Sequence, residues 1–211
     1  MTASALPLHE RVTLRGPAGD IEARIETPQG LERVSTFGVI CHPHPLFGGT
    51  LDNKVVYSLA RAFHDLGVAT IRFNFRGVGA SEGTYADAIG ETEDALAVVE
   101  YGRTRWPGAA LWLGGFSFGG GIAIRAAART PTQQLIVVAP AVRLVNVEDA
   151  KPECPILVVQ GDADVTVDPD SVLSWAASLQ PPAKVAVLPG VEHFFHGRLN
   201  DLRDTVLALR P

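Results

Sequence analysis

Short runs rich in valine, isoleucine and leucine alternate along this chain with longer segments that have helical periodicity. The strand-like runs are 38–41, 68–73, 111–113, 135–139, 156–159 and 185–188, and the helix-like segments are 55–66, 91–101, 121–128, 171–179 and 199–209. Strands that are each followed by a helix pair in parallel and are covered on both faces. The pattern therefore predicts a mostly parallel sheet with helices on both sides.

The N-terminal part has a different pattern. Residues 11–14 and 21–25 alternate between apolar and polar side chains, around a Gly-Pro-Ala-Gly turn at 16–19. Such alternation predicts an antiparallel hairpin, which brings the expected sheet to about eight strands. A chain of 211 residues with 46% hydrophobic content suits one sizeable core, so we expect a single domain over 1–211.

Composition and charge argue against several classes of partner. The formal net charge is −5 and no basic cluster is present, which disfavours nucleic acid. The N-terminal residues do not follow the pattern of a secretory signal, and no stretch of about 18 apolar residues occurs, so we expect a cytoplasmic protein with no membrane partner. Cys41 and Cys154 are too few for a disulfide framework and are predicted to be buried free thiols. The oligomeric state is left open.

The most informative motif is Gly-Phe-Ser-Phe-Gly at 115–119, between a strand pattern and a helix pattern. This is the context of a nucleophile elbow, a strained turn that projects the hydroxyl of Ser117 above the sheet. The flanking glycines suit a turn where neighbouring chain passes closely. A phosphate-binding loop would need lysine after the second glycine, but glycines follow at 120 and 121. The glycine cluster at 77–82 lacks the third glycine of a dinucleotide site.

A serine nucleophile needs a base, and only His193 and His196 follow Ser117 in the chain. His193 comes just after the last predicted strand, at the edge of the sheet where Ser117 is expected. We therefore assign the base to His193. His196 is expected at the start of the final helix, as a surface residue.

The acid that orients the base is expected after the strand at 156–159. That loop contains Asp162, Asp164 and Asp168. Asp168 precedes Pro169 and is better suited to cap a helix. Spacing alone leaves Asp162 and Asp164 as alternatives.

An oxyanion hole needs two backbone N–H donors. One is expected from Phe118, the residue after the nucleophile. The other is expected in the loop at 42–49, where Pro43 and Pro45 have no N–H, so His44 and Leu46 remain.

The pair His42 and His44 also raises the question of a metal. A hydrolytic zinc site needs at least a third protein ligand, and no carboxylate follows closely in this loop. We expect neither a metal nor an organic cofactor.

Several stretches together resemble the small, lidless serine α/β-hydrolases, close to the dienelactone-hydrolase-like group. They lie at 41–50, 72–79, 115–119, 160–164 and 193–196. The resemblance implies an α/β-hydrolase fold without a lid domain, assigns the acid to Asp164 with Asp162 structural, and assigns the second oxyanion donor to His44. The chain has His-Pro at 42–43, where many relatives have His-Gly. Ser117 replaces the cysteine of dienelactone hydrolases and the aspartate of haloalkane dehalogenases, which disfavours both chemistries.

The expected activity is that of a carboxylesterase-like serine hydrolase. Ser117, His193 and Asp164 would cleave a small carboxylic ester through an acyl-enzyme, with Phe118 and His44 as backbone donors. Only residues 141–154 lie where a lid would be inserted, so we expect an open site for short acyl groups. A thioesterase, a small-amide peptidase and a non-catalytic ligand-binding homologue are the alternatives. Aromatic residues expected either in the pocket or in the core are Phe47, Phe116, Phe118, Phe194 and Phe195.

Overall fold

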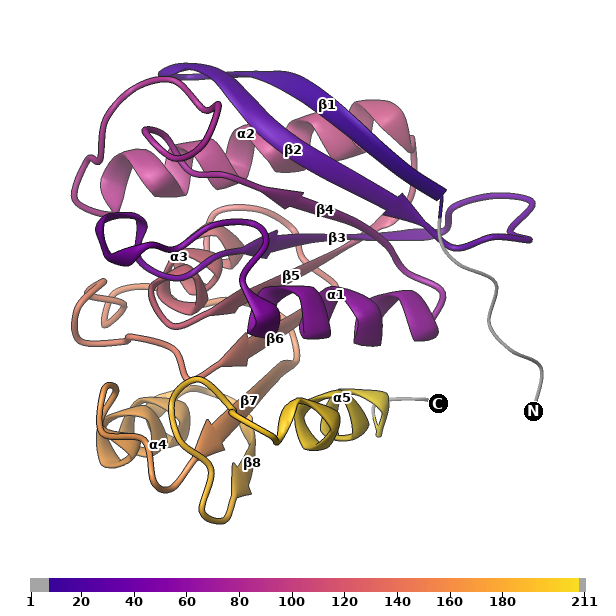
Figure 1. Ribbon diagram of the computed structural model, residues 1–211. Helices are drawn as coiled ribbons and strands as arrows, with labels where there is room; N and C mark the ends of the chain where they lie inside the picture. The colour runs from indigo at the N-terminus through magenta and orange to yellow at the C-terminus, as the bar shows by residue number, and fades with distance from the viewer. Residues whose placement is uncertain (1–7, 209–211) are drawn as a thin grey trace.

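A computed structural model describes residues 8–208 and contains one sheet between two layers of helices (Figure 1). The strands are β1 (Leu8–Gly16), β2 (Gly19–Thr27), β3 (Thr36–Cys41), β4 (Ala69–Phe73), β5 (Ala110–Phe116), β6 (Gln134–Val138), β7 (Ile156–Gly161) and β8 (Lys184–Leu188). The helices are α1 (Lys54–Asp65), α2 (Ile89–Arg105), α3 (Phe118–Ala127), α4 (Pro169–Ser178) and α5 (Leu199–Leu207), with a short 3-10 helix η1 (Pro45–Phe47).

The strand order is β1-β2-β4-β3-β5-β6-β7-β8. β1 pairs antiparallel with β2, and β2 pairs antiparallel with β4, whereas every pairing from β4 through β8 is parallel. The predicted α/β-hydrolase architecture, with its N-terminal hairpin and mostly parallel sheet, is confirmed. The parallel strands all end at one edge, on the left of Figure 1, which we call the carboxyl edge.

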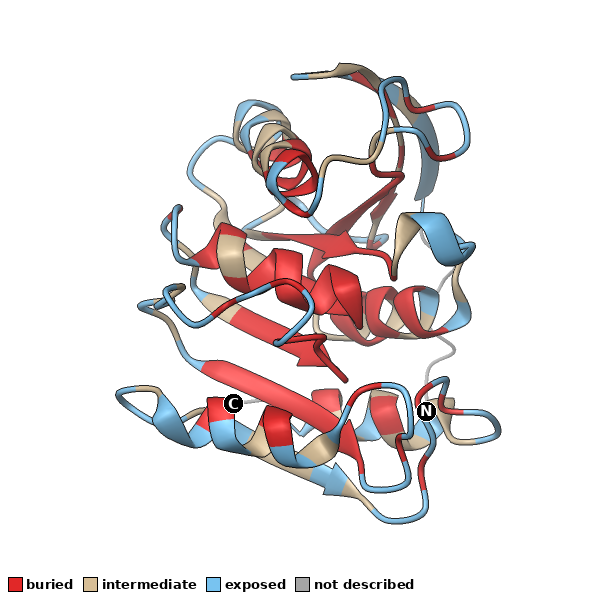
Figure 2. Cartoon of the chain, turned by 90° about the vertical axis from the view of Figure 1, so that its left-hand side faces the viewer, coloured by how far each residue is buried: buried red, intermediate tan, exposed pale blue. Residues whose placement is uncertain are grey.

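Two apolar clusters hold the helices to opposite faces of the sheet. One contains side chains of α2, α3 and α4, and the other contains side chains of α1 and α5. The central strands are buried along their whole length because both faces are covered, which explains the unbroken apolar run at 156–159 in β7. Figure 2 looks onto the carboxyl edge and shows these buried strands surrounded by exposed loops.

The most informative departure from the expected elements concerns α3. Glycines at 119–121 have low helix propensity, so the sequence predicted a helix beginning only at Gly121. The helix begins at Phe118, directly after the serine. Added side chains at Gly119 and Gly121 would collide with the backbone of Cys41 and with the side chain of Val145, so packing selects glycine inside a helix here.

Other departures concern helix ends and single residues. α2 extends beyond the predicted 91–101 at both ends, and the predicted final helix reached Leu209, which lies outside the described residues. Cys41 is a buried free thiol as expected, but Cys154, which precedes β7, is only half-buried. Residues 139–155 join β6 to β7 without a helix or strand, so no lid domain is inserted there.

Candidate active site

Ser117 occupies a sharp turn between β5 and α3, at the carboxyl edge. Its backbone has φ +56° and ψ −120°, a conformation that costs free energy for a residue with a side chain. Hydrogen bonds hold it there: its N–H donates to the carbonyl of Val138 (2.9 Å), and its carbonyl accepts from Gly121 (3.2 Å) and Ala141 (2.9 Å). The strain is therefore imposed by the neighbouring strand and loop, and it is the strain expected of a nucleophile elbow.

The glycines on either side of Ser117 are required by close backbone contacts. A Cβ atom at Gly119 would lie 2.3 Å from the carbonyl oxygens of Cys41 and His42, and one at Gly115 would lie 2.1 Å from the carbonyl oxygen of Gly119. Real Cβ atoms do not approach backbone oxygens so closely. The glycines of the motif are therefore required by the lack of space at the turn as well as by its backbone conformation.

Ser117, His193 and Asp164 form one hydrogen-bonded chain. His193 Nε2 lies 3.0 Å from Ser117 Oγ, and His193 Nδ1 lies 2.7 Å from Asp164 Oδ2. All three residues are buried. They come from the ends of three strands, β5, β7 and β8, and the sheet order brings these ends together. This is the geometry of a serine, a base and an orienting acid.

Asp164 is held as a carboxylate by several donors. Its Oδ1 accepts from the N–H groups of Thr166 and Val167, each at 2.8 Å, while Gln160 Nε2 lies 3.3 Å from its Oδ2. Burial raises the pKa of Asp164, but the hydrogen bonds from His193 and from the two backbone N–H groups outweigh burial, so the pKa is below its usual value. The site therefore contains a charged carboxylate beside His193 at neutral pH.

The other candidate residues have different surroundings. Asp162 Oδ1 accepts from the N–H of Gly190 (2.6 Å) and so holds the turn that precedes His193. Asp168 caps α4 by accepting from the N–H of Asp170 (3.2 Å), as predicted. His196 lies before α5, not at its start, and is mainly exposed, with Nδ1 3.7 Å from Glu192. The structure brings none of these three into the hydrogen-bonded chain.

The residues expected to supply the oxyanion donors, Phe118 and His44, are in contact with each other. The N–H of Phe118 is the first of α3, and the first N–H groups of a helix have no intrahelical acceptor. In the loop after β3, the N–H of Leu46 donates to His44 Nδ1 at 3.2 Å. The N–H of Leu46 is therefore already engaged within the loop. The ring of His44 packs against Phe118, with 4.7 Å between centroids.

His42 connects two loops of the carboxyl edge. Its Nε2 accepts from the N–H of Phe75 (3.0 Å), and its Nδ1 lies 2.6 Å from the carbonyl oxygen of Pro43. Both ring nitrogens are therefore occupied by the protein, so neither is free to bind a metal. Among residues 8–208, no group of three or more histidine, cysteine, aspartate or glutamate side chains is arranged to hold a metal ion.

His42 gives the protein a specific pH dependence of stability. Burial lowers its pKa to about 4, against an ordinary value of about 6.5. Between these two pH values the unfolded chain binds a proton that the folded chain does not. The free energy of unfolding will therefore fall as the pH falls from 6.5 to 4, by about 3 kcal/mol from this group.

The contribution of His42 can be measured by urea unfolding of the wild type and of His42→Gln between pH 4 and 7. Titrations that both proteins share cancel when one unfolding free energy is subtracted from the other. The difference in unfolding free energy will narrow toward pH 4. If the variant does not fold, the ring signals of His42 in the wild type can be followed by NMR. A titration midpoint near 6.5 would contradict the prediction.

The aromatic residues near the site fall into two groups. Phe116, Phe118 and Phe195 are fully buried and belong to the core, whereas Phe47 and Phe194 are exposed at 84% and 50%. Tyr85 was not predicted as a site residue, although its ring lies 5.1 Å from that of His44 and 6.1 Å from that of Phe118. Its place in the loop after β4, at the same edge, is the signal that would have found it.

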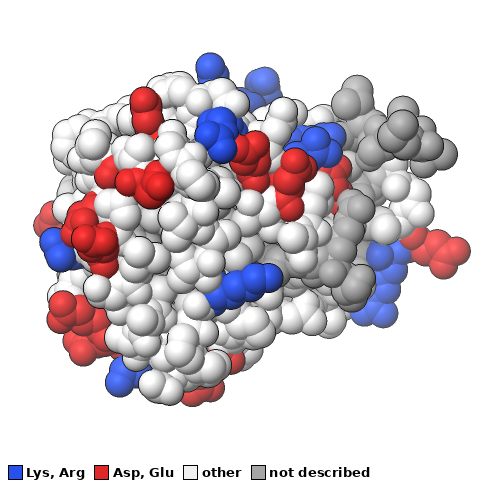
Figure 3. Space-filling model, turned by 90° about the horizontal axis from the view of Figure 1, so that it is seen from below, with Lys and Arg blue, Asp and Glu red and all other residues white. Residues whose placement is uncertain are grey.

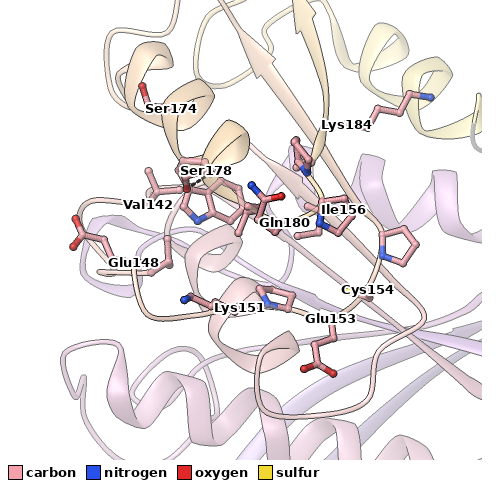
Figure 4. A pocket seen from close by; sticks show the side chains of 18 of the residues that line it. Val142, Glu148, Lys151, Glu153, Cys154, Ile156, Ser174, Ser178, Gln180 and Lys184 are labelled. Carbon is pink, nitrogen blue, oxygen red and sulfur yellow. Dashed lines mark hydrogen bonds between the residues drawn. The ribbon is translucent and has the colours of Figure 1, made fainter.

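A separate cavity of about 1100 Å³ lies between residues 142–155 and α4, and none of the three hydrogen-bonded residues lines it (Figure 4). Trp175 and Gln180 form part of its wall, with Cys154. Burial raises the pKa of the Cys154 thiol to about 11, so it is a neutral thiol at pH 7. In the described part of the chain, no helix is both long and apolar enough to cross a membrane.

Proteins with such a serine turn on a mostly parallel sheet form one class, the α/β serine hydrolases. A family model described as serine aminopeptidase, S33, matches residues 48–152, which include Ser117 but neither Asp164 nor His193. A lidless α/β serine hydrolase from Xanthomonas campestris is 38% identical, with 95% of this chain and 92% of that chain covered and a TM-score of 0.91. The chain belongs to this family, the α/β serine hydrolases without a lid.

Two further relatives agree with this assignment. A structure of an α/β serine hydrolase homologue from Coxiella burnetii is 41% identical, covers 99% of this chain and 98% of that chain, and has a TM-score of 0.90. An uncharacterized protein of Rickettsia prowazekii is 30% identical over 93% of this chain and 86% of its own length. The similarity therefore extends over nearly the whole chain.

Proposed function

We propose that this chain is a carboxylesterase-like hydrolase of small carboxylic esters, with Ser117 as nucleophile, His193 as base and Asp164 as acid. The observation that carries the proposal is the hydrogen-bonded chain among these residues, at 2.7 and 3.0 Å. The strained serine turn provides independent support, since its free-energy cost is hard to explain for a turn without a function.

The proposed reaction has two steps. Ser117 Oγ attacks the acyl carbon while His193 Nε2 takes its proton, and the N–H groups of Phe118 and His44 donate to the developing oxyanion. His193 then gives the proton to the leaving alcohol. Water activated by His193 hydrolyses the acyl-enzyme, and Asp164 stabilises the imidazolium in both steps.

The absence of a lid supports short or compact acyl groups as substrates. An open site removes little of a long acyl chain from water, so added methylenes gain little binding free energy. The match to the serine aminopeptidase model favours a small-amide peptidase as second candidate, because the same residues can cleave amides. A non-catalytic binder is disfavoured by the intact hydrogen-bonded chain.

A substrate panel tests this proposal. We expect p-nitrophenyl acetate and butyrate to be hydrolysed with a higher kcat/KM than the octanoate, a matched acyl thioester or an aminoacyl p-nitroanilide. Faster cleavage of the anilide would replace the esterase assignment with the peptidase. Faster cleavage of the thioester would make the protein a thioesterase.

A further inference from the structure

Exposed apolar side chains are concentrated around the candidate site. Ten large hydrophobic residues are exposed in residues 8–208, and six of them lie on loops or helix starts at the carboxyl edge. Single exposed apolar residues are normal on a protein surface, but a group gathered on one face marks an interaction site. We call these six residues the apolar rim: Leu46, Phe47, Ile89, Leu144, Val165 and Phe194.

The rim surrounds the serine instead of lying to one side of it. Its members come from the segments that follow β3, β4, β6, β7 and β8, whereas Ser117 follows β5 in the middle of the sheet. Figure 2, which looks onto this edge, shows exposed loops on several sides of the buried centre. Whatever contacts the rim therefore also faces Ser117.

Ordered turns hold the rim side chains outward. Val165 is 96% exposed at the tip of a turn whose next two N–H groups both donate to Asp164. Phe47 ends η1, where its N–H donates to the carbonyl of His44 at 3.1 Å. Leu144 lies in a turn closed by a 3.0 Å hydrogen bond from the N–H of Val145 to the carbonyl of Ala141. The local backbone fixes this exposure, and the exposure costs free energy unless something covers the rim.

The charges near the rim indicate an uncharged occupant. Exposed carboxylates at this edge include those of Asp87, Asp162, Asp168 and Glu192. Arginines near the rim are partly neutralised by carboxylates: Arg143 lies 3.5 Å from Asp168, and Arg198 is paired with Asp201. Figure 3 shows acidic side chains with some basic ones among them at this end of the molecule, on the left. An anionic surface would be repelled, whereas a neutral apolar surface would not.

We propose that the apolar rim docks onto the surface of an aggregated neutral ester, such as a droplet of a short-chain acylglycerol, and presents its ester bonds to Ser117. This inference rests on the proposed function for the hydrolysis of the ester bond. The docking itself does not depend on that function. A second protein copy seated on the rim would block access to the serine, whereas a droplet supplies the substrate itself. The acyl chains stay largely in the droplet, so the open site needs no deep acyl pocket.

Docking is measured without catalysis, by flotation of Ser117→Ala with triolein droplets. The rim variant carries Ile89→Ser and Leu144→Ser in addition to Ser117→Ala. Both positions lie outside the hydrogen-bonded chain. The control adds Leu8→Ser and Leu31→Ser, two exposed leucines at the opposite edge. We expect the rim changes to lower the partition coefficient by about tenfold or more, and the control changes to alter it by less than about twofold.

Catalysis is measured separately with the active protein. The rate on tributyrin will rise steeply above the solubility limit of this ester, and Ile89→Ser/Leu144→Ser will lose that rise while it still hydrolyses soluble p-nitrophenyl acetate. Equal droplet binding by the rim and control variants would overturn the proposal. A concentration-dependent dimer that only the rim changes dissociate would also overturn it. Droplet binding without any ester hydrolysis would instead leave docking intact and refute the proposed function.

Discussion

Replacement of Ser117 by alanine will lower kcat/KM for p-nitrophenyl butyrate by about 10⁴-fold or more, with little change in the thermal unfolding temperature. The hydroxyl is the atom proposed to form the acyl-enzyme, and no other group within the hydrogen-bonded chain can replace it. The backbone of the turn is held by hydrogen bonds to Val138, Gly121 and Ala141, which involve no side-chain atom of Ser117. The fold should therefore tolerate the change.

Ser174→Ala is a matched control, because Ser174 is an exposed serine on α4 that lies outside the hydrogen-bonded chain. It should keep the wild-type rate. If Ser117→Ala retained more than about a tenth of wild-type kcat/KM, the assignment of the nucleophile would be wrong.

Replacement of Asp164 by asparagine will also lower kcat/KM by about 10⁴-fold. The cause is the arrangement of hydrogen bonds around this side chain. Asp164 Oδ1 accepts from two backbone N–H groups, and Oδ2 faces His193 Nδ1. Asparagine must direct its oxygen to the two N–H groups, so its NH₂ group faces Nδ1. The histidine then carries its proton on Nε2 and cannot accept the proton of Ser117.

The control for this change is Asp162→Asn. Asp162 lies two residues away and accepts one N–H, from Gly190, which an asparagine oxygen can also accept. Stopped-flow or steady-state assays should find Asp162→Asn close to wild type. A larger loss for Asp162→Asn than for Asp164→Asn would mean that the wrong carboxylate has been assigned to the triad.

The fold could be predicted from the sequence because its strands are buried on both faces. Unbroken apolar runs occur at 135–138 in β6 and at 156–159 in β7, whereas the half-covered hairpin β1–β2 shows period-two alternation. The start of α3 could not be predicted, because three glycines disfavour a helix locally. The close approach of residues 41–42 and of Val145 explains why glycines occupy the first turn of this helix.

The candidate site could be predicted in part. The edge location separated His193 from His196, because His193 follows β8 within a few residues and the structure places it at hydrogen-bond distance from Ser117. Spacing could not separate Asp162 from Asp164, since both lie on one turn and only their side-chain directions differ. The choice between His44 and Leu46 depends on a contact within the loop, from Leu46 N–H to His44 Nδ1, that no pattern of residue types reveals.

The most direct test of the central claim is covalent labelling of the native protein with a fluorophosphonate, followed by mass spectrometry of its peptides. We expect one phosphonyl group per chain, on Ser117, with labelling lost in Ser117→Ala and greatly slowed in Asp164→Asn. A label on any other residue, or ester hydrolysis by a protein that takes no label, would contradict it.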